Sequence, residues 1–200
     1  RTIALNPEST EIHTLCGDSY AALEQSENAL ESYTEALRLD PDMAEVYKKR
    51  GLILLQIGEV KNALVDINKA LELNPRQADA LVGRGNIHLS QEEYAAAITD
   101  YSSAYEIDPS HKGIKAQRGL AYLRTQEYKK AIVDLTQAII EFPEGAKLYY
   151  YKGLANYHLV RHDEAIDDFN EALNLNAQLV DVYIYRANSY AQLGNLEQAL

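Results

Sequence analysis

The prolines of this 200-residue chain recur every 34 residues, and this spacing constrains the fold more than any other feature of the sequence. They are Pro7, Pro41, Pro75, Pro109 and Pro143. Proline ends helices because it lacks an amide donor and its ring clashes with the preceding turn. A helix-ending residue at constant spacing predicts one structural unit that is repeated in tandem.

Small residues follow the same frame. Ten residues after each proline comes a glycine, or an alanine in the last frame: Gly17, Gly51, Gly85, Gly119, Gly153 and Ala187. An alanine stands twelve residues further on: Ala29, Ala63, Ala97, Ala131, Ala165 and Ala199. Apolar residues around these positions are spaced by three and four, which is typical of helices with one buried stripe. Breaks such as Gly58-Glu59 divide each unit into two helices of about 14 residues. We therefore predict antiparallel helix pairs that approach closely where glycine faces alanine.

The repeated pattern resembles that of the tetratricopeptide repeat (TPR) family, whose period is 34 residues. One unit reads Tyr47-x3-Gly51-x2-Leu54, then Ala63-x3-Ile67-x2-Ala70 and Pro75. The resemblance implies an all-α fold, a right-handed superhelical solenoid of antiparallel helix pairs. In this frame complete repeats cover 10–43, 44–77, 78–111, 112–145 and 146–179, with the tail of a preceding repeat at 1–9 and a partial repeat at 180–200. Because both ends fall inside a repeat, we expect the chain to be an internal fragment of a longer array.

Charged residues also recur in register. Basic residues stand directly before the small residue of the first helix: Arg50, Arg84, Arg118, Lys152 and Arg186. Acidic residues stand directly before the large residue of the second helix: Asp66, Asp100, Asp134 and Asp168. The complete repeat that lacks the acid, with Ser32 in its place, also lacks the base and has Cys16 there. This co-occurrence predicts a partly buried ion pair between the two helices of each repeat, which fixes their register. The alternative is a set of independent surface charges.

The family resemblance also implies a binding surface. In TPR arrays the first helices line a concave groove that binds an extended peptide or a helix. Carried onto this chain, the groove positions are Lys48, Leu52, Leu55, Val82, Asn86, Leu89, Leu120, Leu123, Arg124, Tyr150, Leu154, Tyr157, His158, Ile184 and Asn188. These residues are mostly apolar, with scattered amides and cations, and so they favour an amphipathic helix or an apolar extended segment as partner. The alternative is that the leucines only pack against the neighbouring repeat.

Two details refine the expected surface. The carboxylate clamp of chaperone-binding TPR arrays matches this chain at no more than two of its five positions, so that specialisation is not expected. Tyrosines crowd the last third of the chain, and tyrosine is favoured at interfaces for its rigid apolar body and polar tip. We expect Tyr149 and Tyr183 in the core and Tyr150 and Tyr157 at an interface.

Several other functions are not supported by the sequence. A net charge of −11 without a basic run argues against nucleic acid as a partner. The chain contains no phosphate-binding glycine loop, nucleophile elbow or zinc-ligand spacing, so we predict no enzymatic activity, cofactor or metal. No apolar run approaches the length of a membrane span, so no membrane insertion is expected. The single cysteine excludes an internal disulfide and suits a reducing compartment, which favours the cytoplasm.

The sequence therefore predicts a non-enzymatic scaffold or adaptor that binds a protein or peptide partner through the concave groove. Two alternatives remain open. The first is a regulatory or substrate-recruiting TPR segment of a larger enzyme. The second is a self-assembling array that associates through open solenoid ends, where Tyr183, Tyr190 and Leu193 of a terminal helix would lack a full partner.

Overall fold

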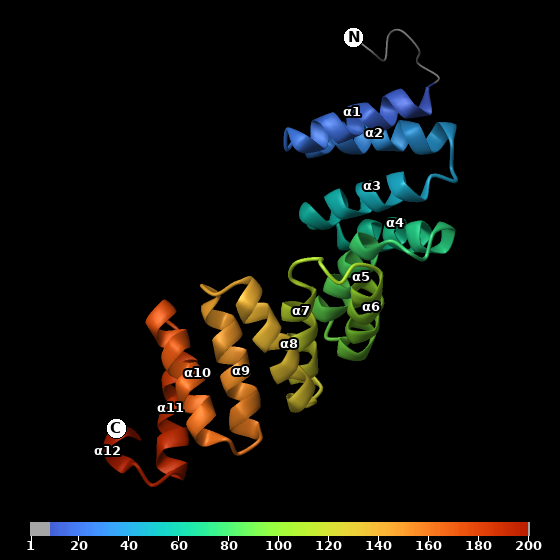
Figure 1. Cartoon of the computed structure of the whole chain (residues 1–200). Helices are drawn as coiled ribbons and strands as arrows, with labels where there is room; N and C mark the ends of the chain where they lie inside the picture. The colour runs from blue at the N-terminus through green and yellow to red at the C-terminus, as the bar shows by residue number, and fades with distance from the viewer. Residues whose placement is uncertain (1–8, 200) are drawn as a thin grey trace. The chain divides into compact units, whose positions relative to one another are not determined.

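The computed structural model describes residues 9–199, and every regular element among them is a helix. The helices are α1 (Thr10–Ala22), α2 (Ser26–Leu39), α3 (Ala44–Gln56), α4 (Val60–Leu73), α5 (Ala78–Ser90), α6 (Tyr94–Ile107), α7 (Ile114–Arg124), α8 (Tyr128–Glu141), α9 (Ala146–His158), α10 (His162–Leu175), α11 (Val180–Gln192) and α12 (Leu196–Ala199) (Figure 1). The predicted all-α fold of tandem helix pairs is confirmed. The predicted tail at 1–9 lies, apart from residue 9, outside the described residues.

The chain divides into two compact units. The first consists of residues 1–91 and 103–109, and the second of residues 92–102 and 110–200, so the division runs through α6. In the first unit α1 packs on α2 and α3 on α4, while α2 contacts α3 and α4 contacts α5. In the second unit α7 packs on α8 and α9 on α10, while α8 contacts α9 and α10 contacts α11. Each unit is thus built by the same local rule, in which a helix pair packs on the next pair in sequence.

Proline marks the end of a second helix, as the spacing predicts. Pro41, Pro75, Pro109 and Pro143 each stand two residues beyond the last residue of α2, α4, α6 and α8. The chain is extended at the C-caps Asp40 and Asn74, where helical geometry has already ended. A proline favours extended backbone in the residue that precedes it. Pro7 lies outside the described residues.

A short turn with one left-handed residue joins the helices of a pair. The left-handed residues are Glu24, Gly58, Glu92, Gln126, Val160 and Gly194, with φ between 57° and 85°. Glycine adopts this conformation without a steric penalty, whereas a β-branched residue does so only under strain. Val160 at φ 62° is therefore the least compatible member of the set.

Close packing within each pair explains the repeated frame of small residues, although one detail of the prediction was wrong. A Cβ added to Gly17, Gly119 or Gly153 would lie within 3.0 Å of a large side chain on the second helix, namely Tyr33, Leu135 and Phe169 respectively. The glycine therefore makes room mainly for the large residue of the partner helix rather than for the alanine. The alanines of the second helices, such as Ala29, Ala131 and Ala165, are fully buried and line the same contact.

Candidate interaction surfaces

In the first unit, the predicted groove residues lie on α3 and α5 and are largely committed to packing and ion pairs. The Lys48 ammonium lies 2.8 Å from Glu45 Oε1 and 3.6 Å from Asp79 Oδ2, and it thereby joins α3 to α5. A methyl group of Leu52 would lie 2.9 Å from a Cβ added to Gly83, so this leucine packs against the facing surface of α5. The remaining predicted residues here are half-buried: Leu55, Val82, Asn86 and Leu89.

In the second unit, the predicted leucines on α7 and α9 belong largely to the protein interior. Leu123 is buried in the core between α7 and α8, where no partner can reach most of its side chain. Leu120 is half-buried and packs against the same cluster. Leu154 contacts this cluster and also the next one, around Phe169. These leucines therefore couple neighbouring helix pairs, which is the alternative that the sequence left open for them.

The predicted interface tyrosines form an aromatic group that continues from α9 to α11. The Tyr150 ring centroid lies 6.4 Å from those of Phe169 and Tyr185, and Tyr157 meets Tyr185 edge-on at 5.4 Å. Rings at these separations attract one another beyond the effect of burial alone. Tyr150 and Tyr157 remain half-buried, so each ring packs on one side and offers an edge on the other. Burial raises the pKa of the Tyr150 hydroxyl to about 12.

Other predicted groove residues of the second unit are exposed. They are Arg124, His158, Ile184 and Asn188. His158 stacks on Tyr128 with ring centroids 4.8 Å apart, so its imidazole covers the start of α8. Tyr183 was expected in the core, but it is 44% exposed and its hydroxyl donates to the Ala177 carbonyl oxygen. Tyr149, at the same place in the first turn of α9, packs on the Phe169 core as expected, so the position in the helix does not explain the exposure of Tyr183.

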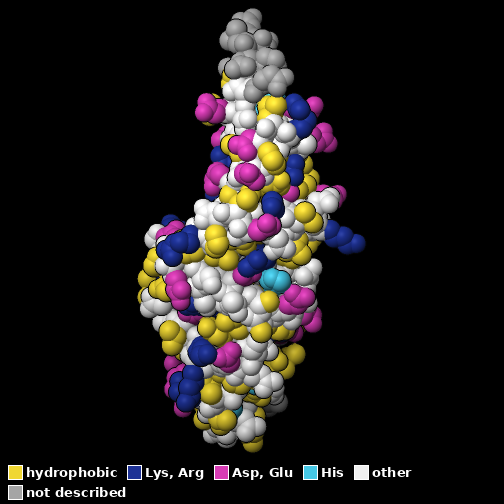
Figure 2. Space-filling view, turned by 90° about the vertical axis from the view of Figure 1, so that its right-hand side faces the viewer, with side chains coloured by type: hydrophobic (Ala, Val, Ile, Leu, Met, Phe, Trp, Pro, Cys, Tyr) yellow, Lys and Arg dark blue, Asp and Glu magenta, His cyan; other side chains and the backbone are white. Residues whose placement is uncertain are grey.

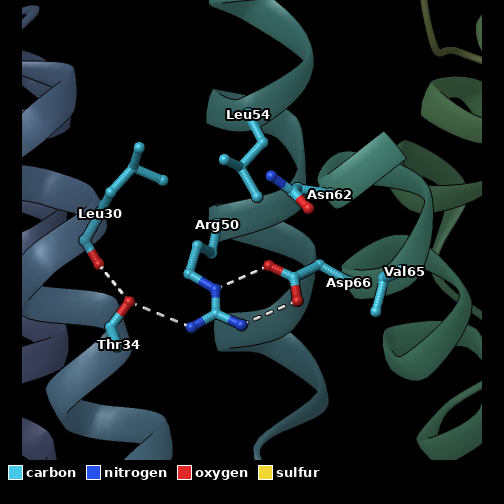
Figure 3. A pocket seen from close by; sticks show the side chains of 7 residues that line it. All are labelled: Leu30, Thr34, Arg50, Leu54, Asn62, Val65 and Asp66. Carbon is cyan, nitrogen blue, oxygen red and sulfur yellow. Dashed lines mark hydrogen bonds and ion pairs between the residues drawn. The ribbon is translucent and has the colours of Figure 1, made fainter. Parts of the chain in front are cut away.

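The interhelical ion pairs predicted from the charge pattern are present in both units. Arg50 Nε and Nη2 donate to the two Asp66 carboxylate oxygens at 2.6 and 2.8 Å (Figure 3). Arg118 binds Asp134 in the same bidentate way, and Lys152 Nζ donates to Asp168 at 2.6 Å. The three carboxylates are nearly fully buried. Bidentate geometry of this kind combines charge with a fixed orientation.

The arginines at this position of the repeat also contact the preceding helix pair, which the sequence pattern did not predict. Arg50 Nη1 donates to Thr34 Oγ1 at 3.1 Å, and the pocket around this contact, of about 330 Å³, is walled by Leu30, Leu54 and Val65 (Figure 3). Equivalent contacts, always sixteen residues back, join Arg84 to Asn68, Arg118 to Ser102 and Arg186 to Asn170. A signal was available, because a hydroxyl or amide residue follows the large residue of each second helix. Arg50 and Arg118 therefore each link their own pair and the pair before it.

Neither a metal site nor a membrane span is found among residues 9–199. No group of three or more His, Cys, Asp or Glu side chains in this range could hold a metal ion. His158 ends α9 and His162 begins α10, so the two histidines stand on different helices. No described helix combines the length and the apolar character needed to cross a membrane. On the face shown in Figure 2, basic and acidic side chains are interspersed with apolar ones.

Tandem antiparallel helix pairs with a small-residue contact in each pair define a helical-repeat protein of the solenoid class. Family models for the tetratricopeptide repeat match residues 44–77, 78–111 and 117–179, and a TPR repeat model matches residues 17–58. The chain belongs to the tetratricopeptide-repeat family.

Several solved structures share the fold. YrrB, a TPR protein with an unusual peptide-binding site, is 24% identical, with a TM-score of 0.79 over 86% of this chain and 89% of its own. MamA is 26% identical, with a TM-score of 0.73 over 88% of this chain and 96% of its own. A tetratricopeptide repeat protein from Parabacteroides merdae is 21% identical, with a TM-score of 0.71 over 95% of this chain and 75% of its own. A comparison with curated protein sequences finds no match. Membership of this family supports a protein-interaction scaffold.

Proposed function

We propose that this chain is a non-enzymatic scaffold that binds a peptide or a short amphipathic helix on the first-helix surface of its second unit. We define this surface by Arg124 of α7, Tyr150 and Tyr157 of α9, and Ile184 and Asn188 of α11. The three helices are neighbours, since α7 contacts α9 and α9 contacts α11. The proposal depends chiefly on one observation, the half-buried tyrosines between exposed residues on the flanking helices.

The chemistry of this surface favours an amphipathic partner. Tyr150 and Tyr157 are held by ring contacts, so little side-chain entropy is lost when a partner packs on their edges. Ile184 is 56% exposed and supplies apolar area that a partner can cover. Arg124 and Asn188 supply exposed polar groups on either side, which can bind main-chain or carboxylate oxygens. An apolar centre with a polar rim is the usual anatomy of an interface.

The first unit is a weaker candidate for the same role. The Lys48 side chain is only 14% exposed and its charge is matched by two carboxylates, so an incoming acidic group would meet a cation that is already paired. YrrB, which shares this fold, has a peptide-binding site, and this supports the proposed class of partner. Cytoplasmic location, the division into the repeats given above, and self-association through the chain ends stay predictions of the sequence.

The proposal is tested by panning a displayed random peptide library on the protein and titrating the selected peptide calorimetrically. Ile184→Asp should weaken binding at least tenfold, because it places a charge in the apolar part of the surface. Ile140→Asp is the matched control, since Ile140 is 70% exposed on α8, a second helix. If Ile184→Asp binds the peptide as tightly as Ile140→Asp does, whether or not both bind more weakly than the wild type, this surface does not bind the peptide.

A further inference from the structure

The start of α8 is a second candidate surface, built from residues other than those that define the first-helix surface. Two pockets of about 340 and 350 Å³ meet there, and both are lined by Lys129 and Lys130. One pocket is completed by Tyr122 and Val133, and the other by Tyr128 and Leu159 among others. Each pocket is large enough for one apolar side chain, and the two lysines stand between them. We call this pair of pockets and the lysines the α8 basic site.

The charges of this site are unevenly matched. Arg118 is bound by Asp134, and Lys130 donates to Glu127 at 2.6 Å while lying 5.2 Å from the Tyr122 ring centroid. Among residues 9–199, no hydrogen bond or ion pair is formed by the exposed Lys129. One uncompensated ammonium therefore stands between two pockets, in a chain whose net charge is −11.

The position of the lysines adds to the argument. Cations in the first turn of a helix face the positive end of its dipole, which is unfavourable. The corresponding turn of α10 instead carries Asp163 and Glu164. The first turn of α8 carries no acid, and the nearest carboxylate, that of the N-cap residue Glu127, is paired with Lys130. An anionic group of a partner bound here would offset the unfavourable interaction between the lysines and the helix dipole.

We propose that the α8 basic site binds an extended acidic peptide in which one carboxylate is flanked by two apolar side chains. The carboxylate would pair with the Lys129 ammonium. One apolar side chain of the peptide would enter the pocket of Tyr122 and Val133, and the other would enter the pocket of Leu159. The Val133 side chain is 65% exposed in the free protein and would be covered by the peptide. A partner of this charge complements the site, because a basic segment would be repelled by Lys129 and an uncharged one would leave it unpaired.

The first unit provides a close internal control. Lys61 and Val65 stand 68 residues before Lys129 and Val133, at the same place in the repeat. The pocket lined by Val65 has Asn62 where the α8 basic site has Lys130. Lys61→Glu and Lys129→Glu therefore change the net charge equally, each at an exposed lysine in the first turn of a second helix.

The probes are capped, fluorescently labelled peptides of the form Leu-(Ser)-Glu-(Ser)-Leu with different numbers of serines, together with the same peptides carrying Gln for Glu. Binding is measured by fluorescence anisotropy and mapped by amide chemical shifts. We expect one spacing to bind, with shifts at Lys129, Val133 and Leu159. Lys129→Glu should weaken it about fivefold or more, the size of one exposed ion pair of ~1 kcal/mol, and Lys61→Glu should not. Affinity should fall with added salt.

Several results would overturn the proposal. The first two are the absence of binding for every peptide spacing and equal affinity for the Glu and Gln peptides. The other two are chemical-shift changes confined to α9 and α11, and equal loss of affinity in Lys129→Glu and Lys61→Glu. Vesicles of phosphatidylcholine and phosphatidylserine serve as a further probe. Binding to them that depends on Lys129, without binding of any peptide, would assign the site to an anionic membrane surface instead. Failure of the first-helix surface in its own test leaves this outcome unaffected, because the two surfaces share no residue.

Discussion

Removing Arg118 should destabilise the protein far more than its surface position suggests. Its guanidinium makes two hydrogen bonds to Asp134, at 2.6 and 3.0 Å, and Nη1 donates to Ser102 at 3.3 Å. The Asp134 side chain is only 8% exposed, so Arg118→Met would leave a buried carboxylate without its counter-ion. Breaking a buried ion pair in this way costs about 3–5 kcal/mol. We expect about 3 kcal/mol, because the arginine itself is partly exposed.

The assay is urea unfolding at neutral pH followed by far-ultraviolet circular dichroism. Lys130→Met is the control, since its ion pair with Glu127 is exposed and its loss should leave the free energy of unfolding unchanged within error. The double variant Arg118→Met/Asp134→Leu should recover most of the loss, because no buried charge then remains unpaired. If Arg118→Met behaves like Lys130→Met, or if the double variant is additive, the ion pair does not fix the helix pair as argued.

Other contacts lead to three further predictions. Gly153→Ala should lower the free energy of unfolding by about 1–2 kcal/mol, because the added Cβ would lie 2.6 Å from the buried Phe169 ring. Gly83→Ala should cost clearly less in the same urea assay, because its Cβ would meet only the methyl ends of Leu52 and Ile67, at 2.9 and 3.2 Å. Val160→Gly should raise the melting temperature by relieving about 1 kcal/mol of left-handed strain, and a lower melting temperature would refute this. Burial raises the pKa of Asp168 above its ordinary value despite Lys152, so the folded state binds this proton more tightly. The stability of the wild type relative to Asp168→Asn should therefore increase on acidification through that pKa, whereas a decrease would show a lowered pKa.

The fold was predictable because the sequence repeats its own constraints. Four second helices end two residues before a proline, and five first helices carry a glycine at the same place, so the same inference is made several times over. The interhelical ion pairs were predictable for the same reason, since Arg50 and Asp66 recur together at fixed spacing. The contact from Arg50 to Thr34 was not predicted because it joins different repeats, and the uncharged residue at the position of Thr34 is a weaker indication of a partner than a carboxylate is.

The interaction surface was less predictable, and physical reasons explain why. A leucine at a groove position of the repeat can either face a partner or pack against the next pair. Periodicity is the same for both, and only the burial of Leu123 separates them. Tyr183 was assigned to the core from its motif position but is 44% exposed, whereas Tyr149 at the same place on α9 is packed, so the motif position alone does not decide burial. Neither the exposed Lys129 nor the pockets beside it could be predicted from the repeat pattern, because they depend on residues from two turns and two helix pairs.

The central claim, that the first helices of the second unit bind a peptide or helix, is tested most directly by mapping a selected peptide on the isotopically labelled protein. Amide chemical shifts would be compared with and without the peptide across residues 110–199. We predict that the largest changes fall on α7, α9 and α11, around Arg124, Tyr157 and Ile184. Changes concentrated on α8 and α10, with these three residues unaffected, would contradict the claim.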